Sequence, residues 1–300
     1  MDCRKLYIIG NGFDLWHGIP SGYQQFQDFV RRYDPVLSKT IEDYLPADEE
    51  WSDLESALAG IDVDCIVDDL EHFATSYGAE GWSDSGHHDF QYEVGRIVEQ
   101  LSAGLRKRFG EWIRRLPIPT PTTALQRLRT IDPAAHFFNF NYTSTLQQLY
   151  CIPDSHVLHI HGAAWLAEDD LVLGHSWNPE QRRPLNERSD IEDMDTRLME
   201  AHSILDQYFS NTFKPSARLI EKHRPFFEQL AWVKDVWVLG HSLSSVDEAY
   251  FRALLAIPAI ASANWRIACR TEWDMDERSI RLRELGVQPS NIITCYWSDL

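Results

Sequence analysis

Short apolar runs alternate with helical patterns along most of the chain. The runs that end at polar or glycine turns, and that we predict to be strands, are residues 5–9, 136–140, 157–160, 171–173, 236–239, 265–268 and 291–295. Apolar residues recur at helical spacing in residues 21–33, 191–209, 215–232, 246–255 and 276–285. This alternation is typical of a mostly parallel sheet covered by helices, so we expect an α/β, Rossmann-like fold.

Residues 45–116 have a different pattern. They contain no strand pattern, and apolar residues recur every three or four positions from Ile97 to Leu116. The segment is followed by Pro117-Ile118-Pro119-Thr120-Pro121, which can form neither a helix nor a central strand. We therefore expect an α/β domain of residues 1–44 and 117–300, interrupted by a helical insertion of residues 45–116.

The charge of the chain is strongly negative and unevenly distributed. The net charge is -18, and residues 41–95 hold sixteen Asp or Glu without any Lys or Arg. Such a charge repels nucleic-acid phosphates, so we expect no direct binding of nucleic acid. The acidic insertion is either a solvated helical surface or the contact of a homo-oligomer or a partner protein.

The remaining composition indicates a cytoplasmic protein. Its five cysteines are scattered singly, which fits neither a disulfide framework nor a zinc motif, and we expect no metal. The sequence has no export signal and no apolar run of eighteen residues, so we expect no membrane association.

The first candidate motif is the glycine turn after the first predicted strand, Gly10-Asn11-Gly12. In an α/β sheet, glycines at this place let the backbone approach a ligand, and the next helix offers free N–H groups to a phosphate. The third glycine of the dinucleotide fingerprint is replaced by Leu15, so a tight structural turn is the alternative.

Two further motifs follow predicted strands. Asn139 and Asn141 point to one side of their strand, where an amide could position a ribose or a water; alternatively, Asn141 and Thr143 only satisfy backbone groups of the turn. His159 and His161 share a strand face before Gly162. A histidine there could be a general base, but a hydrogen-bonded structural pair and a metal pair without a third ligand are alternatives.

The fourth motif, Gly240-His241-Ser242, resembles the nucleophile elbow of hydrolases. The fifth position of that motif is Ser244 instead of glycine. The elbow also needs a histidine downstream of the serine, and no histidine follows His241, so we exclude a serine hydrolase.

Taken together, "IIGNGFDLWHGIPSGYQQF", "FNFNYTSTLQQLY", "LHIHG" and "VWVLGHSLSSVDEAYF" resemble the AbiH family of bacterial abortive-infection proteins, whose pattern is similar to the sirtuin-like NAD-binding folds. The resemblance implies a catalytic Asn141 and His161. The residues that it and the motifs assign to the dinucleotide are Gly10, Asn11, Gly12, Phe13, Asp14, Asn139, Tyr142, Thr143, Gly162, Gly240, His241 and Ser242. Thr143 stands where sirtuin-like enzymes usually have Asp, and the zinc-binding C-x-x-C pairs of sirtuins are missing.

The resemblance therefore implies an anti-phage effector that hydrolyses NAD to nicotinamide and ADP-ribose, as a homo-oligomer or with a defence-system partner. Asn141 would position the ribose or a water, and His161 would accept a proton. Thr143 in place of Asp favours the alternative of a sensor that binds NAD, ADP-ribose or another nucleotide without cleaving it. A metal-dependent nuclease or nucleotide hydrolase that uses His159 and His161 is a third possibility.

Overall fold

The centre of the fold is a six-stranded parallel sheet. The computed structural model describes residues 4–73, 89–166, 171–187 and 194–300. Its strands are β1 (Lys5–Ile9), β2 (His136–Asn139), β3 (Val157–His159), β4 (Asp235–Leu239), β5 (Asn264–Cys269) and β6 (Ile292–Tyr296), in the order β3-β2-β1-β4-β5-β6. This is the strand order of Rossmann folds, with the switch point between β1 and β4. The expectation of an α/β, Rossmann-like fold is confirmed.

One predicted strand is wrong. Residues 171–173 have irregular backbone and do not belong to the sheet. Leu171 and Leu173 are buried nonetheless, and the backbone N–H of Val172 donates a single bond to the carbonyl of His161. The apolar run therefore reflects the burial of two side chains and not pairing with another strand.

The chain divides into two compact units, which differ from the expected domains. Unit 1 comprises residues 1–22, 110–172 and 215–300, and unit 2 comprises residues 23–109 and 173–214. Residues 23–44 and 173–214 thus join the helical unit, although the sequence suggested that they belong to the α/β domain. The proline segment 117–121 is irregular and lies in unit 1, as expected, whereas residues 110–116 of the expected insertion belong to unit 1 as well.

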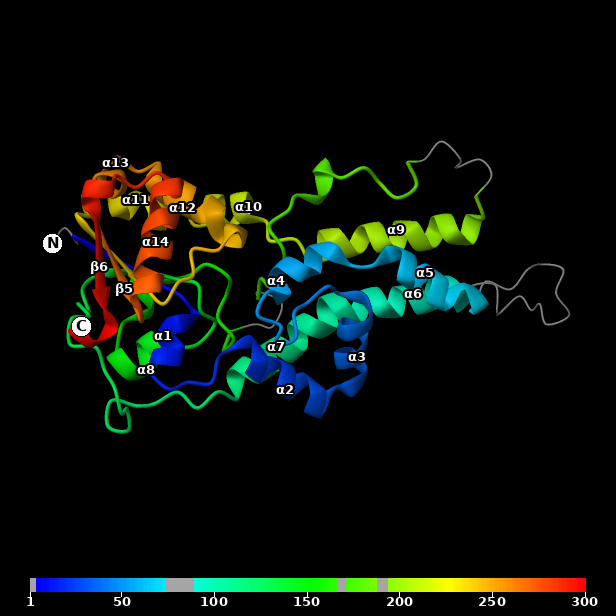
Figure 1. The fold of residues 1–300 in the computed structure, drawn as a ribbon, viewed down its shortest axis with the longest axis horizontal. Coiled ribbons are helices and arrows are strands. Elements are labelled where there is room, and N and C mark those ends of the chain that lie inside the picture. Colours follow the sequence, from blue (N-terminus) through cyan, green and yellow to red (C-terminus); the bar gives the residue numbers. More distant parts are fainter. Residues whose placement is uncertain (1–3, 74–88, 167–170, 188–193) are drawn as a thin grey trace, which may run out of the picture. The chain divides into compact units, whose positions relative to one another are not determined.

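Helices cover both faces of the sheet in unit 1 (Figure 1). On β1, Leu6 and Ile8 face one core cluster, and Tyr7 and Ile9 face the other. The helices of unit 1 are α1 (Asn11–Trp16), α8 (Thr145–Tyr150), α10 (Ser216–Lys222), α11 (Arg224–Glu228), α12 (Glu248–Leu255), α13 (Pro258–Ala261) and α14 (Glu272–Leu285). Helices α1 and α8 pack on the Tyr7 face, whereas α11, α12, α13 and α14 pack on the Leu6 face.

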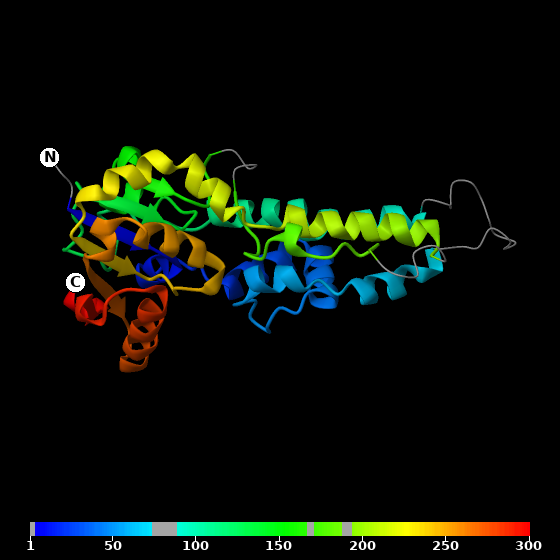
Figure 2. The ribbon, with the colours of Figure 1, turned by 90° about the horizontal axis from the view of Figure 1, so that it is seen from above.

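Unit 2 consists of helices in the described residues (Figure 2). They are α2 (Tyr23–Tyr33), α3 (Pro35–Tyr44), α4 (Leu54–Ala57), α5 (Val63–Leu70), α6 (Asp89–Glu99), a π-helical turn (Gln100–Gly104) and α9 (Thr196–Asn211); α7 (Leu105–Arg114) contains a unit boundary. Helices α6 and α9 pack along each other. The fully buried Lys214 forms an ion pair with Glu55, which also accepts a hydrogen bond from Tyr23. No helix within the described ranges combines the length and apolarity needed to cross a lipid bilayer.

Candidate functional site

The glycine turns after β1 and β4 pack directly against each other. The N–H of Gly12 donates to the carbonyl of Gly240 at 2.8 Å, and the N–H of Gly10 donates to the carbonyl of Leu239 at 3.0 Å. A Cβ on Gly240 would lie 2.1 Å from the backbone nitrogen of Phe13, and Gly240 has φ +74. The glycines are therefore required for close backbone contact at the switch point. Contact of this turn with a pyrophosphate stays a prediction. The N–H groups of Gly10 and Gly12 already donate to carbonyls within the protein.

The asparagines of the second motif connect the ends of β1 and β2. Asn141 donates from Nδ2 to the carbonyl of Gly10 at 3.1 Å, while the Oδ1 of Asn139 accepts the backbone N–H of Asn141 at 3.0 Å. Both side chains are buried. Asn139 therefore stabilises the turn. Asn141 satisfies a backbone carbonyl, as in the structural alternative, and at the same time brings its amide to the switch point.

The two histidines of the third motif do not act as a pair. The strand β3 ends at His159, and the chain turns through Gly162 at φ +88. His159 Nδ1 donates to the carbonyl of Asn141 at 2.8 Å, and its Nε2 accepts from Gln147 at 3.0 Å. Burial lowers the pKa of His159, which is partly opposed by the Asn141 carbonyl. This ring is therefore a neutral structural group, and His161 has different partners.

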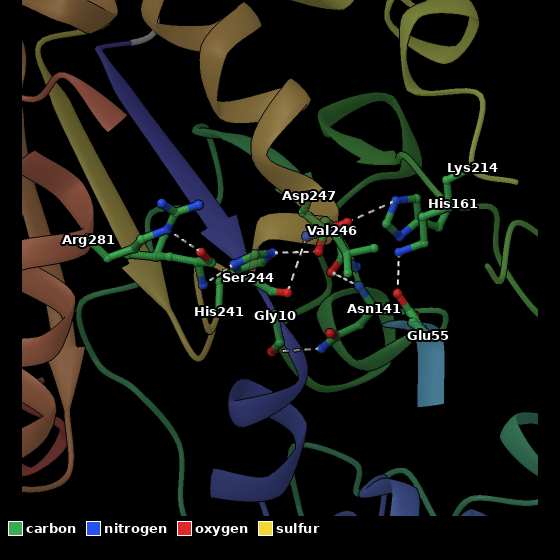
Figure 3. A network of polar contacts seen from close by, with 12 residues as sticks. Gly10, Glu55, Asn141, His161, Lys214, His241, Ser244, Val246, Asp247 and Arg281 are labelled. Carbon is green, nitrogen blue, oxygen red and sulfur yellow. Dashed lines mark hydrogen bonds and ion pairs between the residues drawn. The ribbon is translucent and has the colours of Figure 1, made fainter. Parts of the chain in front are cut away.

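His161 lies beside a carboxylate that the sequence analysis missed. The Nε2 of His161 is 3.6 Å from Oδ1 of Asp247, and the Nε2 of His241 is 3.4 Å from Oδ2 of the same carboxylate (Figure 3). These are ion-pair distances, longer than hydrogen bonds. The ring of Phe140 packs against both imidazoles, which are 3% and 4% exposed. One partly buried carboxylate thus lies beside two imidazoles from different segments of the chain.

The backbone orients the second imidazole of this cluster. His241 Nδ1 accepts the N–H of Leu243 at 2.9 Å, so its proton is on Nε2, which faces Asp247. Leu243 has φ +59, a conformation that is unfavourable for leucine. On α14, Arg278 and Arg281 donate to the carbonyls of His241 and Leu243, which holds the turn in this shape. The predicted turn therefore positions an imidazole, while Ser242 points to solvent.

Asp247 ends a short 3-10 helix, Ser245–Asp247, that leads into α12. The hydroxyl of Ser244 caps this helix by accepting the N–H of Val246 at 3.3 Å. A signal was present in the sequence, because "GHSLSSVD" places an acidic residue at the start of a predicted helix. That signal does not show that Asp247 lies close to His161, because His161 comes from a distant part of the chain.

The other predicted contact residues have partners within unit 1. The amide of Asn11 exchanges two hydrogen bonds with Ser21, and Phe13 is a core residue that packs on Tyr150. Tyr142 donates its hydroxyl proton to the carbonyl of Val172 at 2.7 Å. These contacts give the residues structural roles, and their contact with a dinucleotide stays a prediction.

Asp14 is the most unusual polar residue of the motifs. Its side chain is 1% exposed, and Oδ2 accepts the hydroxyl proton of Thr143 at 2.6 Å. Burial raises the pKa of Asp14 to about 6, against the opposing effect of hydrogen bonds from Thr143, Thr145 and Asn141. An ionisable group that changes charge near neutral pH therefore lies directly behind Thr143.

Two hollows lie at the carboxyl ends of the strands in unit 1. A hollow of about 580 Å³ adjoins the ends of β5 and β6 and is lined by Leu15, Trp16, Cys269, Arg270, Tyr296 and Trp297, among others. A smaller hollow of about 170 Å³ is lined by Arg114, Tyr142, Thr143, Ser144, Gln148 and Trp165, among others. Neither of these two hollows is lined by Asn141 or His161. Within the described part of the chain, His, Cys, Asp and Glu residues form no cluster of three that could hold a metal ion.

The fold and the residues at the carboxyl ends of its strands define the class of the protein. It is a Rossmann-like α/β protein whose polar residues gather at the switch point of a parallel sheet. The chain belongs to the bacteriophage abortive infection AbiH family, because the model of that family matches residues 6–269. No match was found among curated proteins or among solved structures. Membership of this family indicates a role in abortive infection by phage. The relationship to sirtuin-like folds stays a prediction.

Proposed function

We propose that this protein is an anti-phage effector that hydrolyses NAD to nicotinamide and ADP-ribose. The observation that supports the proposal most is the convergence of Asn141, His161, Asp247 and His241 near the switch point. These residues come from three separate stretches of sequence and meet where open α/β sheets bind ligands. An amide, two imidazoles and a carboxylate are more polar chemistry than a buried sheet edge needs for stability.

Cleavage of the bond between nicotinamide and ribose leaves an oxocarbenium-like sugar. Nicotinamide departs as a neutral molecule with the electron pair of the C–N bond, so the leaving group needs no acid. In the proposed mechanism Asn141 holds the ribose or a water, and His161 accepts a proton from a ribose hydroxyl or from that water. The Asp247 carboxylate, 3.6 Å from the ring, would stabilise the imidazolium that forms.

The larger hollow suits the other end of the dinucleotide. It lies at the same sheet edge and contains Trp16, whose ring stacks on Trp297 with centroids 5.4 Å apart. Aromatic faces bind purine rings by stacking, and the guanidinium of Arg270 complements a phosphate. In this proposal the adenosine part lies over β5 and β6, and the nicotinamide ribose lies over β2 and β3.

Release of nicotinamide from NAD by the purified full chain tests the proposal. His161→Ala should lose on the order of 10² to 10⁴ in rate because a general base is removed, and Asn141→Ala should also lose activity. His156→Ala is the matched control, because its ring only bonds to the carbonyl of Pro133 outside the site. The assay is run with and without lysate of phage-infected cells, since an effector has to be inactive before infection. Turnover of His161→Ala equal to that of the parent would remove His161 from the mechanism.

A second candidate function is a sensor that binds NAD, ADP-ribose or another nucleotide without cleaving it. Two observations favour it: Thr143 replaces the usual acidic residue, and the candidate histidine His161 is almost fully buried. A sensor should show a higher melting temperature in the presence of NAD or ADP-ribose, since a ligand that binds only the folded state stabilises it. Stabilisation without nicotinamide release favours the sensor, whereas release of nicotinamide favours the hydrolase.

A further inference from the structure

The buried carboxyl of Asp14 is connected to the protein through only one of its oxygens. Oδ2 accepts the proton of Thr143 at 2.6 Å, whereas Oδ1 is buried without a hydrogen-bond partner among the described residues. Structural carboxylates in protein interiors normally have all their oxygens satisfied, because a buried group without partners is costly. An asparagine would accept the same hydrogen bond from Thr143 without a charge, with its amide nitrogen in the place of Oδ1. The acidity of Asp14 is therefore not required by the fold.

Thr143 links this carboxyl to the smaller hollow. Its hydroxyl donates to Asp14 and accepts from the hydroxyl of Thr145 at 3.1 Å. A threonine oxygen has two lone pairs, so these contacts leave one for a further donor. Thr143 also lines the hollow of about 170 Å³, which corresponds to roughly six waters at about 30 Å³ each. A donor in the hollow, the Thr143 hydroxyl and the Asp14 carboxyl can thus form one continuous hydrogen-bonded path.

We propose that Asp14 and Thr143 form a proton relay that serves the hollow, with Asp14 as the terminal proton acceptor. The inference rests on the proposed cleavage of NAD. In this mechanism His161 accepts the proton of a ribose hydroxyl, and the relay takes the proton of the water. As a water in the hollow attacks the ribose carbon, its proton passes to Thr143 Oγ1 while the proton of Thr143 passes to Asp14 Oδ2. The new C–O bond replaces the C–N bond, and nicotinamide leaves with the electron pair. Asp14 becomes a neutral acid and returns its proton to solvent before the next turnover.

The relay explains the departure at position 143. Sirtuin-like enzymes usually have Asp at this position, and in this chain the acid comes from α1, through the hydroxyl of Thr143. The groups that face the carboxyl from the neighbouring segments are Thr143, Thr145 and Asn141, and all of them are neutral. The ionisable residue that ends its own helix, His17, bonds to the carbonyl of Phe13 and the hydroxyl of Tyr150. The acidity of Asp14 is therefore governed by burial and neutral hydrogen bonds.

The first test measures nicotinamide release against pH for the full chain and for Asp14→Asn, Thr143→Val and Thr143→Ser. The activity of the parent should fall as the pH drops through about 6, where Asp14 becomes protonated. Asp14→Asn and Thr143→Val should each lose on the order of 10² or more in rate, and their double variant should be no worse than either, because both break one path. Thr143→Ser should keep most of the activity, since it keeps the hydroxyl. The exposed Asp154→Asn is the control and should match the parent.

The second test follows the Asp14 carboxyl carbon by NMR during a pH titration of the full chain. It should titrate near pH 6, and at a higher pH in Thr143→Val, because the Thr143 hydrogen bond lowers the pKa of Asp14. A parent that cleaves NAD while Asp14→Asn has an unchanged rate and pH profile overturns the relay and leaves the proposed function intact. A parent that releases no nicotinamide overturns the proposed function. In that case the NMR titration alone tests the relay. A pKa of Asp14 near 3.8, or a pKa that is the same in the parent and in Thr143→Val, overturns it.

Discussion

Replacing Asp14 by Asn should make the protein more stable at neutral pH. Burial raises the pKa of Asp14 from 3.8 to about 6. Since one pKa unit corresponds to about 1.36 kcal/mol, ionisation of this carboxyl costs the folded state about 3 kcal/mol more than the unfolded state. Asn has nearly the same shape, can accept the Thr143 hydroxyl and does not ionise. Burial of the amide N–H2 in the place of Oδ1 offsets about 1 kcal/mol or more of this, so the net gain in the free energy of unfolding is expected to be about 1 to 2 kcal/mol at neutral pH.

The gain should depend on pH in one direction only. A folded-state pKa that is raised contributes stability that is present below the unfolded pKa of 3.8 and is lost as the pH rises through about 6. The difference in the free energy of unfolding between variant and parent should therefore be constant below pH 3.8, rise in favour of the variant by about 3 kcal/mol between 3.8 and 6, and remain constant above 6. A pH-independent difference would indicate a packing effect instead of a charge effect.

Urea unfolding of the parent and Asp14→Asn at several pH values measures this difference. The exposed Asp154→Asn is the matched control, because it removes a carboxylate without changing a buried group. An Asp14→Asn variant with the stability of the parent above neutral pH would refute the reasoning. It would mean that Asp14 has an ordinary pKa in the folded state, through a water or a rearrangement at Oδ1.

Two other substitutions test the surroundings of the switch point. His17 is held neutral by burial, which lowers its pKa from 6.5 to about 4, so its stabilising effect is present above 6.5 and lost as the pH falls through 4. The difference in urea stability between the parent and His17→Gln should therefore shrink by about 3 kcal/mol between neutral pH and pH 4; an unchanged difference would contradict the neutral state of His17. Gly240→Ala should destabilise by about 2 to 5 kcal/mol, from about 1 to 2 for the positive φ and about 1 to 3 for the displacement of Phe13. Its control is Gly18→Ala, because Gly18 has φ +77 and no atom lies within 4 Å of the added Cβ. In thermal unfolding this control should lose only the part of the stability that is due to the positive φ. Equal losses for the two variants would refute the packing argument.

The sequence was sufficient for the features that depend on local periodicity. The strand β1 was predicted with its observed bounds, and the other strands of the sheet were predicted to within a residue or two. The glycine turn, the asparagine turn and the His161 segment were all predicted to follow strands of one parallel sheet. Carboxyl ends of parallel strands meet at one edge, so this local information also implied a common edge.

Only the tertiary structure decided which side chains meet. Asp247 lies between His161 and His241, and Asp14 bonds to Thr143 across 129 positions of sequence. Hydrophobic periodicity carries no information about such pairs, because it reports which face of an element is buried and not which element covers it. The same reason explains the unit boundaries. The helical pattern of residues 191–209 was visible in the sequence, but the packing of the observed helix α9 against α6 depends on contacts more than 100 residues apart.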